Sequence, residues 1–152
     1  MKTCDKLVFV GTGNTSVSPM AEAILQDRFK LEDILIESKG LVVLFPEPVN
    51  PKAEEVLEEN GLNMQEHMSS PFSANEFDER NLIITIRESQ KEKILKEYEQ
   101  AVNVYTLCEY LGYEEVIGDP YGRSIGEYRQ CFRVLKELVN QLADKLKQED
   151  SQ

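Results

Sequence analysis

The residues best suited to chemistry lie in one short loop, residues 11–18. The loop follows Leu-Val-Phe-Val at residues 7–10, a short run bounded by glycine that predicts a buried strand. Ser18 followed by Pro19 predicts a helix with Ser18 as its N-cap, and Glu22 is expected in the first turn, where a carboxylate suits the helix dipole. Loop amides and a helix N-terminus then converge, which predicts an anion-binding loop. Its candidate binding residues are Thr12, Gly13, Asn14, Thr15, Ser16 and Ser18.

A nucleotide-binding site is a second interpretation of the same loop. Gly11-Thr12-Gly13-Asn14-Thr15-Ser16 follows a predicted strand and is close to the GxGxxG pattern of dinucleotide-binding folds. Glu37 would then be the acidic residue at the end of the second strand. Because Ser16 stands in place of the third glycine, only part of the pattern is present.

Composition excludes several classes of partner. The chain has 152 residues and a formal net charge of −11, which argues against binding to nucleic acid or to anionic membranes. No apolar run approaches the ~20 residues of a membrane-spanning helix, and the N-terminal apolar run is too short for a signal peptide. Cys4, Cys108 and Cys131 are odd in number and widely spaced, which favours reduced thiols in the cytoplasm. No metal and no cofactor is expected.

Strand-like and helix-like segments alternate along the chain, which predicts a parallel α/β sheet with helices on both faces. Further strands are expected at 31–38, 82–86 and 102–107, and helices at 19–30, 51–60, 88–100 and 125–147. The apolar residues 41–45 are expected to form a hydrophobic flap or a partial cover of the core, with a ligand-contacting wall as the alternative. The final QEDSQ segment should fray. We expect one domain, residues 1–152.

Ligands of such sheets bind at the carboxyl ends of the strands. The loop at residues 11–18 lies at this edge. The loop after the fourth strand can bring Asp119 to the same edge, so Asp119 is a candidate site residue.

These motifs resemble the low-molecular-weight protein phosphatases. That family carries a nucleophilic Cys, five residues, then Arg and Ser or Thr, followed by Pro-Met-Ala-Glu-Ala or a close variant. The matching residues are Asn14, Ser18, Pro19, Met20, Ala21, Glu22 and Ala23. Ser38-Lys39-Gly40, the helix after Asn50 and Asp119-Pro120-Tyr121 resemble further family motifs. The resemblance spans nearly the whole chain and implies a three-layer α/β/α fold with a four-stranded parallel sheet.

One bacterial subgroup, the protein-arginine phosphatases, is the most similar. Val104-Tyr105-Thr106-Leu107 and the segment from Asp119 to Ile125 resemble that subgroup. In it a loop Thr favours phosphoarginine over phosphotyrosine, and Thr15 occupies that position.

Two catalytic residues of the family, the nucleophile and the phosphate-clamping arginine, are missing. The resemblance assigns the nucleophile to the position of Gly11, the phosphate-clamping arginine to Val17, a frequent second Cys to Ser16 and the general acid to Asp119. Glycine has no nucleophilic atom, and valine cannot form the bidentate fork that arginine makes with phosphate. The residues that the resemblance assigns to loop support are retained: Asn14, Ser18, Ser38 and His67.

The preferred hypothesis is therefore an inactive phosphatase homologue, a pseudophosphatase, that weakly binds a phosphorylated protein or a phosphate-like anion. A competing hypothesis is an active phosphatase with an unrecognised nucleophile. Thr15 and Ser16 have no evident base. Cys4 is expected at the opposite end of the first strand, and Cys108 and Cys131 are expected to be buried structural thiols. A nucleotide-binding domain that uses Gly11-Thr12-Gly13 and a purely structural role both stay open. For His67, the only histidine, a hydrogen-bonding role is favoured over catalysis.

Overall fold

The computed structural model describes residues 4–29, 34–114 and 117–150, and within them four parallel strands form one sheet. The strands are β1 (Lys6–Gly11), β2 (Leu35–Gly40), β3 (Asn81–Thr85) and β4 (Val104–Thr106), in the order β2-β1-β3-β4. The register pairs Gly11 with Gly40 and Val10 with Thr85, so the carboxyl ends of three strands meet at one edge. The predicted parallel α/β fold is confirmed.

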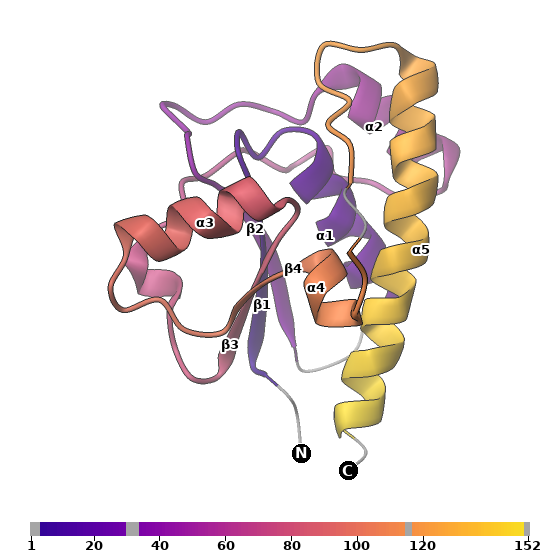
Figure 1. Cartoon of the computed structure of the whole chain (residues 1–152). Coiled ribbons are helices and arrows are strands. Elements are labelled where there is room, and N and C mark those ends of the chain that lie inside the picture. Colours follow the sequence, from indigo (N-terminus) through magenta and orange to yellow (C-terminus); the bar gives the residue numbers. More distant parts are fainter. Residues whose placement is uncertain (1–3, 30–33, 115–116, 151–152) are drawn as a thin grey trace.

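Helices cover both faces of the sheet, with α3 on one side and α1 and α5 on the other (Figure 1). The helices are α1 (Val17–Arg28), α2 (Pro51–Glu59), α3 (Glu88–Glu97), α4 (Leu107–Leu111) and α5 (Ile125–Asp150), with a 3₁₀ turn at Ala74–Glu76. In the described part of the chain, no helix is both long enough and apolar enough to cross a membrane.

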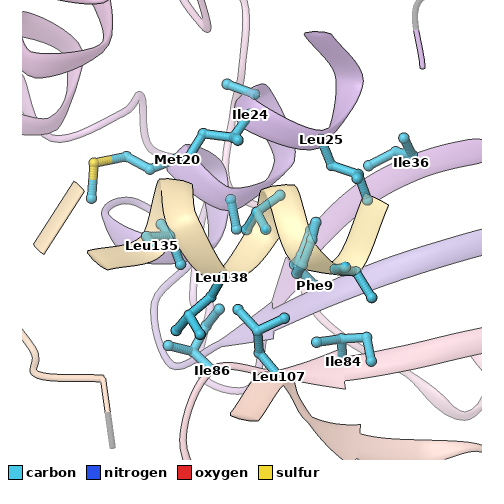
Figure 2. Packing of buried hydrophobic residues seen from close by; sticks show 14 of the residues in the cluster. Phe9, Met20, Ile24, Leu25, Ile36, Ile84, Ile86, Leu107, Leu135 and Leu138 are labelled. Atoms are coloured by element: carbon cyan, nitrogen blue, oxygen red, sulfur yellow. The ribbon is translucent and has the colours of Figure 1, made fainter. Parts of the chain in front are cut away.

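The central strand β1 is buried on both sides, which explains its continuous apolar sequence. Phe9 faces the larger core cluster, where it packs with Ile84 beneath the side chains of α1 and α5 (Figure 2). Val8 and Val10 face the smaller cluster, together with Ile94 of α3. Both clusters hold β1 rigidly, and the loop at residues 11–18 begins at its end.

The first helix begins earlier than the sequence predicts. Its N-cap is Ser16 rather than Ser18, and Pro19 is the third helical residue. Proline is acceptable there because the first turn has no intrahelical acceptors for its N–H groups. Glu22 consequently lies beyond the first turn, so the predicted dipole role of Glu22 was wrong.

Other boundaries also differ from the prediction, by one residue at each end of β3 and by more in the following elements. β2 begins at Leu35, and residues 31–33 of the predicted strand lie outside the described residues. α3 ends at Glu97, short of the predicted residue 100. The fourth strand is only three residues long and leads directly into α4, which the prediction missed although Thr106 and Glu109 form a capping box. α5 continues to Asp150, so the predicted fraying was wrong for 148–150, while 151–152 lie outside the described residues.

Candidate anion-binding site

A cavity of about 480 Å³ opens at the carboxyl edge of the sheet. All of residues 11–18 line it, together with the flap at residues 42–45 and the segment after β3. Asp119 and Tyr121 complete the wall from the loop before α5. The structure thus brings the predicted loop and the predicted acid into one cavity.

The carbonyl groups of the loop are already used by the surrounding protein. Gly11 O and Thr12 O accept hydrogen bonds from the amides of Leu41 and Val42, at 3.0 and 2.9 Å. Thr15 O accepts from the Asn50 amide at 2.8 Å. The amides of residues 12–18 donate to no other group in the described part of the protein. The loop therefore has donors to spare for an anion, which is the requirement of a phosphate-binding loop.

Two of these unused amides, those of Val17 and Ser18, belong to the first turn of α1. Its N-cap Ser16 makes no side-chain capping bond, because its hydroxyl lies 3.2 Å from the hydroxyl of Tyr128 on α5. The uncapped amides carry the partial positive charge of the helix N-terminus. This arrangement favours a negatively charged ligand.

Asn14 holds the loop in shape from its centre. It adopts a left-handed φ of 60°, which asparagine tolerates better than most residues. Its Nδ2 donates to Ser18 Oγ at 3.0 Å and to Ser38 Oγ at 2.9 Å. Its Oδ1 accepts from the Ser70 amide at 3.0 Å. The two bonds donated by Asn14 are buried and the third is partly buried, so together they fix the backbone of the loop.

His67 and Glu22 extend the network under the loop. His67 Nε2 donates to Asn14 O at 3.0 Å, and its Nδ1 lies 4.0 Å from Glu22 Oε1. Ser38 Oγ donates to the same carboxylate at 2.5 Å. Burial raises the pKa of Glu22, although the hydrogen bond from Ser38 and the nearby His67 favour the ionised form. The structure places Ser38, His67 and Ser18 where the resemblance implied, and it adds Glu22, whose role the prediction missed.

Gly11 and Val17 occupy the positions at which the resemblance places the nucleophile and the arginine. A Cβ built on Gly11 would lie 2.9 Å from Ser18 Oγ, a distance that real Cβ atoms essentially never show, and a tight 3.2 Å from Ser18 Cβ. The Val17 side chain packs against the core and presents only methyl groups to the cavity. Neither position offers a group that could attack or clamp a phosphate.

Asp119 faces a guanidinium group that the prediction did not include. Arg87 Nη1 lies 3.5 Å from Asp119 Oδ2, and the Tyr121 amide donates to Asp119 Oδ1 at 3.0 Å. Gln90, in the first turn of α3, donates to Thr12 Oγ1 at 3.2 Å. The sequence did contain a signal for Arg87 as a site residue. Arg87 directly follows the predicted strand at 82–86, which puts it at the same edge of the sheet as the loop.

The flap at residues 42–45 is a wall of the cavity rather than a cover of the core. The side chains of Leu44 and Phe45 are 89% and 64% exposed, and both line the cavity. The predicted alternative, a ligand-contacting wall, therefore describes this segment better.

Several other candidates lie away from the cavity. Glu37 sits in the middle of β2, where its Oε1 lies 2.8 Å from Lys6 Nζ, so its predicted place at the strand end was wrong. Cys4 precedes β1 and Cys108 is buried in α4. Cys131 is half-buried, and burial raises the pKa of its thiol to about 11. Among the residues that the structure describes, no cluster of His, Cys, Asp or Glu could hold a metal.

Comparisons with known proteins identify the family of this chain. Residues 6–152 match the family described as low molecular weight phosphotyrosine protein phosphatase, and the chain belongs to this family.

Two groups of relatives are similar to the chain. A low molecular weight protein-tyrosine-phosphatase PtpB of Staphylococcus haemolyticus is 35% identical over 141 residues, covering 90% of this chain and 96% of the relative. A protein-arginine-phosphatase of Bacillus subtilis is 33% identical over 147 residues, covering 94% of this chain and 97% of the relative.

Solved structures agree with these matches. The YwlE arginine phosphatase from Geobacillus stearothermophilus superposes with a TM-score of 0.88 at 30% identity, covering 95% of this chain and 94% of that one.

Proposed function

We propose that this chain is a pseudophosphatase that binds a phosphorylated protein, or another phosphate-like anion, without hydrolysing it. The observation that carries the proposal is the absence of a side chain at Gly11. In a covalent phosphatase mechanism the nucleophile takes the phosphoryl group from the substrate, and a Cα hydrogen cannot do so. Removing the nucleophile of a serine protease costs on the order of 10⁶ in kcat, which indicates the size of the expected loss.

A related solved structure illustrates what Gly11 lacks. It is described as a mutant of the YwlE arginine phosphatase with a phosphorylated active-site serine. A hydroxyl at the site thus accepted phosphate in that protein.

The hydroxyl groups in this loop are poorly placed to substitute. Ser16 Oγ is bonded to Tyr128 at 3.2 Å, and the nearest histidine, His67, is committed to the Asn14 carbonyl. Without a base in hydrogen-bonding reach, a hydroxyl is a weak nucleophile. These contacts disfavour an active enzyme with a substitute nucleophile.

The binding role rests on the loop itself. Its amides have no other protein acceptor in the described part of the chain, and the supporting bonds of Asn14 keep them in place. We expect weak binding, because Val17 contributes no charge and the whole chain carries a net charge of −11. Thr15 lines the cavity, and by the resemblance to arginine phosphatases we expect phosphoarginine to be preferred over phosphotyrosine. The widely spaced, odd set of cysteines supports a cytoplasmic location.

The proposal is tested by turnover. The purified chain should not hydrolyse p-nitrophenyl phosphate or phosphoarginine above buffer, while the Bacillus subtilis relative assayed in parallel should. Turnover that survives repurification and is abolished by Asp119→Asn would contradict the proposal, since Asp119 is the remaining residue with a catalytic role in the resemblance.

A further inference from the structure

Arg87 is the one arginine or lysine that lines the cavity, as far as the described residues go. Two carboxylates, Glu47 and Asp119, line the same cavity. Without Arg87 the charged groups of the wall would both be negative, and the loop amides would have to hold an anion against them. Arg87 is therefore the group on which the charge balance of the cavity depends.

The backbone of Arg87 is fixed to the anion-binding loop. The Ile86 amide donates to Val10 O at 3.2 Å, one residue before the loop begins. The Arg87 amide donates to Gln90 Oε1 at 2.9 Å, and Gln90 Nε2 donates to Thr12 Oγ1 at 3.2 Å. Gln90 is buried, and its two hydrogen bonds connect the backbone of Arg87 to the loop.

The guanidinium group, in contrast, is loosely held. Its distance to Asp119 Oδ2 is 3.5 Å, at the limit of a hydrogen bond, and the side chain is 41% exposed. Exposed ion pairs of this kind contribute little to stability. The guanidinium can therefore leave Asp119 for a stronger acceptor at little cost.

We propose that Arg87, the N-cap residue of α3 just after β3, supplies the positive charge that Val17 does not. In this arrangement the Arg87–Asp119 pair is the resting state, and a tetrahedral oxyanion such as a phosphate group competes with Asp119 for the guanidinium. The ligand is held between the amides of residues 12–18 and the planar fork of Arg87, a geometry that suits phosphate oxygens. This inference rests on the proposed binding function and names the residue that provides its charge.

The competition has a consequence that a structural ion pair would not have. If Asp119 restrains Arg87, then Asp119→Asn frees the guanidinium and removes a repelling carboxylate, so phosphate should bind more tightly. If Arg87 and Asp119 only stabilise the loop before α5, both substitutions should lower stability and leave phosphate affinity unchanged.

The experiment is a calorimetric titration of the full chain with inorganic phosphate at low ionic strength. Arg87→Gln should weaken binding about tenfold or more, Arg87→Lys should weaken it less, and Asp119→Asn should tighten it several-fold. Arg123→Gln is the matched control, because Arg123 is an exposed arginine near Asp119 that does not line this cavity. The affinity of the Arg123→Gln variant for phosphate should stay within about twofold of that of the parent chain.

The outcomes separate this inference from the proposed function. Phosphate binding that Arg87→Gln leaves within twofold of the parent, or that Asp119→Asn weakens, would overturn the role of Arg87 alone. A parent chain that binds no phosphate would overturn both proposals. If Arg87→Gln does not fold, Arg87→Lys and Asp119→Asn still decide the result through their opposite expected effects.

Discussion

Gly11→Ala tests whether the loop has room for a side chain at position 11. A Cβ at Gly11 would lie 2.9 Å from Ser18 Oγ, and that hydroxyl cannot turn aside freely because Asn14 Nδ2 donates to it at 3.0 Å. Overpacking of this kind costs about 1–3 kcal/mol. Replacing glycine also restricts the unfolded chain, which stabilises the folded state by about 0.4–1 kcal/mol. We therefore expect a net loss of about 1–2 kcal/mol in the free energy of unfolding, which for a chain of this size lowers the Tm by roughly 2–8 °C.

Gly13→Ala is the matched control in the same loop. Its Cβ would meet only Thr15 Oγ1, at 3.9 Å, and its φ is outside the left-handed region. It should be neutral or stabilising by up to about 1 kcal/mol. Urea and thermal unfolding of both variants measure the difference. Equal stability of the two alanine variants would refute the steric argument and mean that the loop has room for a side chain at Gly11.

Two further predictions concern titration and catalysis. Burial raises the pKa of Glu22 above its ordinary value of 4.5, so above that pH the folded state holds more protons than the unfolded state and stability falls as the pH rises. Glu22→Gln should flatten this fall above about pH 4.5 in unfolding experiments, and parallel curves for parent and variant would contradict the assignment. Gly11→Cys with Val17→Arg should give measurable phosphoarginine hydrolysis and a phosphocysteine intermediate, because positioning and electrostatics supply most of this catalysis. Neither single variant should turn over, and a folded double variant that binds phosphate but forms no phosphocysteine would show that the loop support has also changed.

Much of the fold could be predicted from local sequence. The apolar runs at 7–10 and 82–86 indicated strands because buried parallel strands are apolar on both faces. The motif from Asn14 to Ala23 identified the loop and the family. In α5, apolar residues at helical spacing indicated the buried side of the helix, which the structure confirms: Tyr128, Phe132, Leu135, Leu138, Val139, Leu142 and Leu146. These features depend on neighbours close in the chain, so the sequence contains them directly.

Local patterns also misled at particular positions. Pro19 fits any place in the first turn of a helix, so it could not fix where α1 begins. Glu22 was assigned to the dipole because its neighbours in sequence suggested a helix start, but its side chain is instead buried against Ser38 of β2. A helix pattern predicts which residues share a face and leaves open which strand that face meets.

The sequence by itself determined which side chains the loop can offer, with Gly11 and Val17 at the positions where the family resemblance places a nucleophile and an arginine. The tertiary structure decided the rest of the site. Strand order places Arg87 at the end of β3, beside the loop, and opposite Asp119, which lies 32 positions further along the chain. Tyr128 meets Ser16 across 112 positions because α5 packs over α1. Such contacts depend on how the layers pack together, and no periodicity within a single segment records that packing.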